Sequence, residues 1–342
     1  MRRRSLIVLG SAFAVAVAAC GGGGGGDDTE QQAVTTTAAP VPVAPLTGLP
    51  DPDGVAQGRP ALTVKVDNLD GQGVRPQSGL EQADVVYEEV TEGGITRFAA
   101  VFQSQVPGEV GPIRSVRSID PDLVTPLGGV FAYSGGAQPN VEKLQLAPVN
   151  SVDESQAGDA MFRVDGKEAP HNLFGRGQAL FDKGGQPAPP PALFEFREEG
   201  DTLTAEPVAA FTVGFIETPG YSPTYSYDAA TRTWKRDIGG VPFTAVSGAQ
   251  IAPTNVVVQF IEYTGGGEGN VLGEGDAWIF SDGQLVRGRW VRPAVEQPAQ
   301  YVDAAGQPVK LLPGTTWVEL LPIGAPVDVL PAAPAPPAPP ST

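Results

Sequence analysis

The sequence predicts an α+β fold in which a mixed α/β N-terminal domain is followed by an all-β C-terminal domain. Glycine and proline are abundant, at 44 and 35 of the 342 residues, which favours short elements joined by tight turns. Strand patterns alternate with short helix patterns up to about residue 183. Beyond residue 200, helical periodicity nearly vanishes and strand patterns dominate.

The mixed domain is expected over residues 46–183. Apolar and polar residues alternate from Ala61, which predicts a strand. Asp120 followed by Pro121 predicts a helix that starts with an aspartate cap and ends before Pro126. The expected strands are 61–67, 84–90, 96–103 and 130–134, and the other expected helices are 78–83, 140–146 and 176–183.

A Gly- and Pro-rich segment, 184–199, predicts a linker to the β-rich domain, 200–325. Asp282-Gly283 is a hairpin turn signal inside that domain. The Ala- and Pro-rich end, 326–342, predicts a disordered tail. The expected strands of the β-rich domain are 211–216, 224–227, 233–236, 256–263, 277–280, 285–291 and 316–321.

The N-terminus has the pattern of an export signal. Three arginines are followed by a short apolar run, and Val17-Ala18-Ala19 precedes the only cysteine, Cys20. This arrangement resembles the lipobox of bacterial lipoproteins, which implies cleavage after residue 19 and acylation of Cys20, for example with palmitate. Six glycines follow, so 20–45 is expected to be a flexible lipid-anchored tether. The predicted location is the extracytoplasmic face of the cell membrane.

Composition excludes several classes of chemistry. The net charge of −17 argues against a nucleic-acid partner, because an acidic protein repels phosphates. Since the single cysteine lies at the anchor, the folded part offers no disulfide and no thiol nucleophile. One histidine is too few for a zinc site of several histidines. We therefore expect neither a metal nor a cofactor.

Charged residues of the first half form the candidate site. Glu88 and Glu89 are consecutive in an expected strand, so they point to opposite faces and at least one is expected to be partly buried. A buried carboxylate must pair with a cation or become neutral, and Arg97 is the natural partner. The candidate ligand-binding residues are Arg97, Arg114, Arg117, His171 and Asn172, and the candidate catalytic residues are Glu88, Glu89, Glu92 and His171.

Three interpretations of this cluster remain open, and enzymatic activity is uncertain. The arginines could clamp a carboxylate- or hydroxyl-bearing ligand. A glutamate could act as the general acid of a glycan-cleaving enzyme. The charges could also be structural ion pairs that pin a hairpin to a loop. His171 could equally order its loop by a hydrogen bond or serve as a general base or ligand contact.

A weaker pattern suggests a serine nucleophile. Ala132-Tyr133-Ser134-Gly135-Gly136 follows an expected strand and resembles a nucleophile elbow, with His171 downstream. However, Ser134 and His171 are too close in sequence for the usual hydrolase sheet, and Pro139 interrupts the elbow. A glycine-rich turn is the preferred interpretation.

Several short motifs extend over nearly the whole chain from about Pro45 to Pro322. They are Arg59-Pro60, Asp67-Asn68, 75–80, 83–88, 92–97, 111–117, 170–173, 255–259, 288–290 and 313–318. Together they resemble the YerB-type bacterial lipoprotein family, and 111–117, the arginine loop, is fairly specific. The resemblance implies a two-part extracytoplasmic lipoprotein of unknown function, and it supplies no reaction.

The sequence thus predicts a membrane-anchored envelope protein that binds a cell-envelope component, such as cell-wall glycan or peptide, through an Arg/Glu/His cleft. Two alternatives remain, a cell-wall glycan-cleaving enzyme and a structural partner of another envelope protein. They differ in one observable respect. A catalytic glutamate should line an open cleft beside hydroxyl-binding groups, whereas a structural glutamate should be enclosed by arginine.

Overall fold

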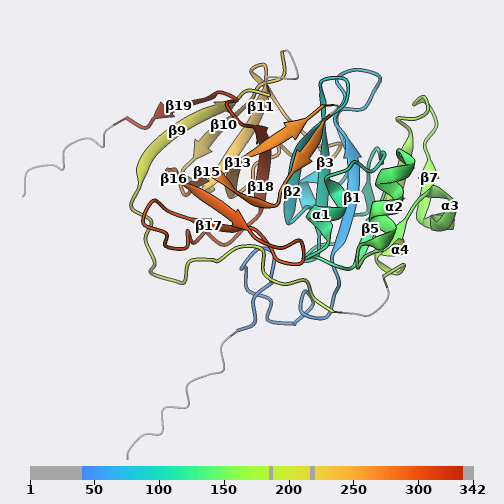
Figure 1. The fold of residues 1–342 in the computed structure, drawn as a ribbon, viewed down its shortest axis with the longest axis horizontal. Coiled ribbons are helices and arrows are strands. Elements are labelled where there is room, and N and C mark those ends of the chain that lie inside the picture. The colour runs from blue at the N-terminus through green and yellow to red at the C-terminus, as the bar shows by residue number, and fades with distance from the viewer. Residues whose placement is uncertain (1–40, 185–187, 216–219, 266, 334–342) are drawn as a thin grey trace, which may run out of the picture. The chain divides into compact units, whose positions relative to one another are not determined.

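A computed structural model describes residues 41–184, 188–215, 220–265 and 267–333 (Figure 1). The predicted signal peptide, Cys20 and the last nine residues of the tail lie outside this part of the chain. The N-terminal domain contains short strands, α-helices (α) and 3-10 helices (η). They are β1 (Leu62–Asp67), η1 (Leu80–Gln82), β2 (Val85–Thr91), β3 (Ile95–Phe102), β4 (Glu109–Val110), α1 (Asp120–Val124), β5 (Val130–Ala132), α2 (Gln138–Leu146), β6 (Asn150–Val152), α3 (Glu154–Ala157), η2 (Gly158–Ala160), β7 (Met161–Arg163), β8 (Leu173–Arg176) and α4 (Gly177–Phe181).

The C-terminal domain is built from strands in its described residues. Its alternating segments form hairpins, and Asp282 adopts a positive φ of 55° where β15 turns into β16. The strands are β9 (Glu206–Val213), β10 (Pro223–Asp228), β11 (Thr233–Ile238), β12 (Val241–Pro242), β13 (Asn255–Thr264), β14 (Glu268–Asn270), β15 (Gly273–Ser281), β16 (Gln284–Arg292), β17 (Gln300–Val302), β18 (Thr316–Pro322) and β19 (Val327–Pro331).

One sheet joins the two domains. Its strands follow the order β12-β11-β10-β9-β16-β15-β13-β18-β2-β3-β1-β5-β6, while β14, β17 and β19 pair with β13, β16 and β9. The junction is a parallel ladder between β18 and β2, in which Glu319 lies opposite Glu88. A second, small sheet has the order β4-β8-β7. The β-strands of both domains therefore share a continuous hydrogen-bonded framework.

Each face of this sheet carries a hydrophobic core with residues from both domains. Phe98 and Trp317 pack edge to face at 5.2 Å in one core, which also includes Phe243. Val85 and Val257 belong to the other core, on the opposite face. The polar residues described below lie among these apolar clusters.

The fold prediction is confirmed only in part. Two domains are indicated, but the chain is mainly β, and the longest described helix, α2, has nine residues. Gly and Pro residues follow closely after the helices, each of which has nine residues or fewer, so strands are the main framework. The mixed α/β character of the first domain is correspondingly weak.

Three segments that were predicted as a tether, a linker and a disordered tail contain ordered contacts. In the predicted tether, Ala44 is buried and Val43 bridges to Pro50. In the predicted linker, Leu193 and Phe194 are buried against the C-terminal domain. Residues 327–331 of the predicted tail form β19, which pairs with β9. In each case the segment contacts the folded domains, which its local composition did not predict.

Candidate functional site

Glu88 and Glu89 point to opposite faces of β2, and this separation organises the polar interior. Glu89 lies opposite Arg97 on β3, and Arg97 lies opposite Asp67 on β1. Directly opposed residues of antiparallel strands share a face. Glu89, Arg97 and Asp67 therefore lie on one face, while Glu88 lies with Phe98 on the other.

Asp67 is the central acid of the first face. Its Oδ2 lies 2.7 Å from Nδ1 of His171 and 3.0 Å from Nε of Arg114. The backbone N–H of Arg114 donates to the carbonyl of Lys65 at 2.9 Å, which fixes the arginine loop against β1. The Asp67 carboxylate thus orients both the His171 imidazole and the Arg114 guanidinium. His171 therefore has Asp67 as its acidic partner.

Arg97 and Arg117 converge on a single backbone carbonyl. The Nη1 atoms of both donate to the carbonyl of Ser115, at 3.2 and 3.3 Å. Burial, together with repulsion from Arg117 and Arg114, lowers the pKa of Arg97 to about 10. No carboxylate of the described residues forms an ion pair within 4 Å of the Arg97 guanidinium. The guanidinium groups of Arg97, Arg114 and Arg117 are therefore close together on this face, and these three residues are called the arginine group.

Arg117 lies where this group of residues reaches the surface. Its guanidinium makes a bidentate pair with Glu92, including an Nε–Oε2 distance of 2.6 Å. Partial burial opposes ionisation of Glu92, but a backbone hydrogen bond and Arg117 outweigh it, so the Glu92 pKa is lowered. Both side chains line a hollow of about 190 Å³ together with Ser118 and Asn140. The hollow gives solvent access to the arginine group.

Glu89 is enclosed by Lys65 rather than by Arg97. The Nζ atom of Lys65 contacts Glu89 and lies 2.8 Å from Oδ1 of Asp120, and all three side chains are fully buried. Burial, followed by repulsion from Asp120, raises the pKa of Glu89 to about 7. The other oxygen of Asp120 accepts the backbone N–H of Arg117 at 2.6 Å. The buried triad of Lys65, Glu89 and Asp120 is thereby hydrogen-bonded to the arginine loop.

Of the three guanidinium groups, two have a direct carboxylate partner. Arg114 pairs with Asp67 and Arg117 with Glu92, whereas no carboxylate of the described residues lies within 4 Å of Arg97. Glu89 and Asp120 both contact Lys65, so the cations and carboxylates of this face are equal in number, and Glu268 also borders the hollow beside Arg117. Guanidinium groups in this arrangement can bind a carboxylate or another oxyanion through paired N–H donors.

Glu88 belongs to a separate network on the opposite face. Its carboxylate accepts hydrogen bonds from Arg236 at 2.7 Å, and from Tyr221 and Thr96 at 2.6 Å each. Arg236 also bonds Oε1 of Glu319 at 3.2 Å. Burial, and then the nearby Glu88, raises the pKa of Glu319 well above its ordinary value. Glu88 is thus fully enclosed by donors from both domains.

Asn172 does not join the arginine group. Its side-chain oxygen accepts a hydrogen bond from Nη1 of Arg163 at 2.6 Å, and Arg163 also pairs with Glu154 at the surface. Within the described ranges, no three His, Cys, Asp or Glu side chains are grouped so that they could hold a metal ion. A helix long and apolar enough to cross a membrane is likewise not found among the described residues.

Comparisons with known proteins agree on one family. Residues 46–186 match the "Protein of unknown function (DUF3048) N-terminal domain", and residues 211–318 match its C-terminal domain. A Bacillus subtilis (strain 168) protein named "Putative lipoprotein YerB" is 29% identical over 305 residues, which are 82% of this chain and 86% of that protein. The crystal structure of YerB protein from Bacillus subtilis has a TM-score of 0.70 at 25% identity, and the match covers 84% of this chain and 99% of that one.

The chain belongs to the YerB-type family. The two YerB-type domains contribute unequally to the polar interior. The N-terminal domain supplies the complete arginine group, together with Asp67 and His171. The network around Glu88 needs both domains, because Arg236 comes from the C-terminal domain. The arginine group is therefore a property of one domain, whereas the Glu88 network joins the two.

Several residues that contact the predicted site residues of this YerB-type chain were not predicted from its sequence. Lys65 and Asp67 occupy alternate positions of an otherwise apolar strand, and that spacing was an available signal for charges on one face. Asp120 was assigned only a helix-capping role, although α1 includes it and its carboxylate contacts Lys65. Arg236 gave no local signal, since it is 148 residues from Glu88.

Proposed function

We propose that this protein is a lipid-anchored envelope protein that binds a carboxylate-bearing cell-wall component through Arg97, Arg114 and Arg117. Attachment through an acylated Cys20 follows from the lipobox pattern and agrees with the name of the Bacillus subtilis relative. The anchor restricts the ligand to material near the outer face of the membrane. Cell-wall peptides attached to glycan carry free carboxylates, which suit guanidinium donors.

Arg97, which has no ion-pair partner among the described residues, carries this proposal together with its neighbours Arg114 and Arg117. Three guanidinium groups share two carboxylates, and Arg117 borders a hollow of about 190 Å³. His171 is held against the group by Asp67 and supplies a further polar contact. An arriving carboxylate would replace part of the exposed Glu92 pair, so the ligand would compete with an internal carboxylate for Arg117.

The burial of the glutamates favours binding over glycan cleavage. Glu88 and Glu89 are fully buried and enclosed by Arg236 and Lys65. A glycosidase needs two carboxyl groups that flank the scissile bond in an open cleft. Glu92 is exposed, but its bidentate partner Arg117 lowers its pKa, which suits an ionised partner better than a general acid.

The proposal is tested by binding of soluble cell-wall fragments to the full chain, purified from membranes in detergent. The fragments are a disaccharide with a short peptide, prepared with free carboxylates or with the same groups amidated. Arg117→Gln removes a bidentate donor and is expected to weaken binding of the free acid by about tenfold, since a hydrogen bond to a charged group contributes about 1.5–3 kcal/mol. The dissociation constant is measured by calorimetry.

Arg163→Gln is the matched control, because Arg163 also pairs with a carboxylate in the same domain but lies outside the arginine group. Its affinity should equal that of the wild type. Amidated fragments should bind wild type as weakly as free fragments bind Arg117→Gln. Equal affinity of both fragment forms for the wild type would contradict the proposal.

A further inference from the structure

A second hollow lies between the linker and the C-terminal domain. It has a volume of about 590 Å³ and is bordered by the linker residues 191–195 and by the segment 297–302 around β17. At its inner end lies a small cavity of about 20 Å³, and Phe194, Pro298 and Tyr301 line both spaces. The larger space falls within the usual volume range of small-molecule sites, and the smaller one has room for about one water-sized group.

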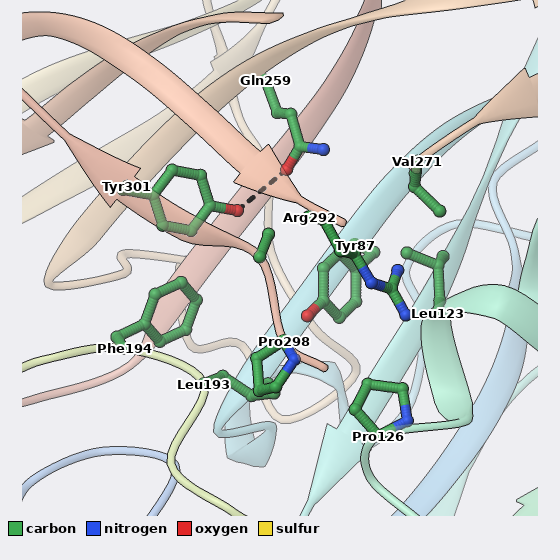
Figure 2. Close-up of a pocket in the computed structure, with 11 residues that line it drawn as sticks. Tyr87, Leu123, Pro126, Leu193, Phe194, Gln259, Val271, Arg292, Pro298 and Tyr301 are labelled. Atoms are coloured by element: carbon green, nitrogen blue, oxygen red, sulfur yellow. Dashed lines mark hydrogen bonds between the residues drawn. The ribbon is translucent and has the colours of Figure 1, made fainter. Parts of the chain in front are cut away.

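The inner cavity contains a buried cation without a carboxylate partner (Figure 2). Arg292 is only 3% exposed. Its Nε donates to the carbonyl of Gln297 and its Nη2 to that of Val295, each at 2.8 Å, and Nη2 also bonds the carbonyl of Asp122. Within the described ranges no carboxylate lies within 4 Å of this guanidinium, and the carboxylate of Asp122 is paired with Lys143 at 2.6 Å. Backbone carbonyls thus orient a charge that they do not neutralise.

Burial lowers the pKa of Arg292, and the carboxylates of Asp122 and Glu296, which are not in direct contact with it, act in the opposite direction. The other polar groups that line the cavity are amides and hydroxyls. The hydroxyl of Tyr301 donates to Oε1 of Gln259 at 2.8 Å, which leaves the amide N–H groups of Gln259 without a partner among the described residues (Figure 2). Gln259 itself is buried. Tyr87 lines the same cavity, and no Asp or Glu does. The cavity is therefore lined by Arg, amide and hydroxyl donors beside apolar walls.

We propose that this hollow binds a small amphipathic carboxylate, with one carboxylate oxygen in the inner cavity beside Arg292 and the apolar body along Phe194 and Pro298. The charge of the ligand follows from a guanidinium that has no carboxylate within 4 Å among the described residues, and from the donors around it. Glu195 borders the outer space, away from the proposed carboxylate position beside Arg292. Its apolar body follows from the aromatic and proline walls, and its size from the volume of the outer space. The site goes beyond the arginine group, since it shares no lining residue with that group.

The test is an NMR titration of the full chain with 4-phenylbutyrate and with its neutral counterpart 4-phenylbutyramide. The acid has one carboxylate on an apolar body, and the amide preserves the shape without the charge. The acid is expected to bind at least tenfold more tightly than the amide. If the wild type binds neither compound, or binds both equally, the proposal is overturned.

Two variants locate the binding. Arg292→Gln removes the charge, and Ala299→Phe fills the junction of the two spaces without removing any bond of Arg292. Each should weaken binding of 4-phenylbutyrate at least tenfold in protein whose circular dichroism matches that of the wild type. Unchanged affinity in a folded Ala299→Phe protein overturns the proposal, whatever Arg292→Gln does.

Two controls separate this site from other effects. Ala304→Phe places the same new ring on the exposed turn after β17, and its affinity should match that of the wild type. Arg117→Gln should also leave 4-phenylbutyrate binding unchanged, so failure of the cell-wall proposal and failure of this one are distinguishable. A tenfold loss in Arg117→Gln would assign the acid to the arginine group and overturn the proposal for Arg292.

Discussion

Two neighbouring glutamates, Glu88 and Glu89, have different partners on the two faces of the central sheet. Glu88 lies in a closed network, where Arg236 and Tyr221 from the C-terminal domain saturate its carboxylate. Glu89, the next residue, lies in a triad with Lys65 that supports an arginine group open to the surface at Arg117. Identical side chains thus stabilise a domain junction on one face and a candidate ligand site on the other.

The difference lies in what covers each face. The C-terminal strands β10 and β11 contribute Tyr225 and Arg236 to the face of Glu88, where Tyr225 also bonds Glu319. The loop after β4 contributes Arg114 and Arg117 to the face of Glu89. Side chains of the C-terminal domain close off Glu88, whereas Arg117 of the loop borders a hollow that opens to solvent.

Arg236→Met should have the largest effect, because it leaves Glu88 and Glu319 buried together without a cation. Removal of one partner from a buried ion pair typically costs about 3–5 kcal/mol. We expect a fall of this size in the free energy of unfolding, measured by urea denaturation at pH 7. The matched control is Arg289→Gln, whose pair with Glu274 is exposed and should contribute about 1 kcal/mol or less. Equal losses in the two variants would contradict the closed-network description.

Glu89→Gln should change how stability depends on pH. The pKa of Glu89 is raised from its ordinary value of 4.5 to about 7, so between these values the native state binds more protons than the unfolded state. The contribution of Glu89 is therefore fully present below about pH 4.5 and is lost as the pH rises through 7. Urea denaturation at pH 5 and pH 7.5 should show a smaller fall in stability for Glu89→Gln than for wild type.

Glu92→Gln is the control for the pH dependence of stability, and it has the smallest predicted effect on the free energy of unfolding. Because the Glu92 pKa is lowered, its titration lies below this window and the slope should match that of the wild type. Its exposed pair with Arg117 should contribute less than about 1 kcal/mol to stability. Loss of this competing carboxylate should tighten binding of the free-acid cell-wall fragments, measured by calorimetry. Weaker binding would show that Glu92 assists the ligand rather than competing with it.

Local patterns predicted much of the strand framework. The expected strand from Ala61 corresponds to β1, and the expected strands 84–90 and 96–103 correspond to β2 and β3 around the Glu92-Gly93-Gly94 turn. The opposite orientation of Glu88 and Glu89 also followed from the two-residue period of a strand. The natural pairing of a glutamate with Arg97 was wrong, because Lys65 and Arg236 take those roles.

Sequence by itself determined the family, the strand alternation and the presence of charges on both faces of β2. These are local properties, since residues at fixed spacing share a face whatever packs upon them. Only the tertiary structure decided that Arg236 encloses Glu88, that Asp67 holds His171, and that the linker lines a hollow beside Arg292. Each of these contacts joins segments far apart in sequence. Burial and ion pairing there depend on tertiary packing, which a local sequence pattern does not predict.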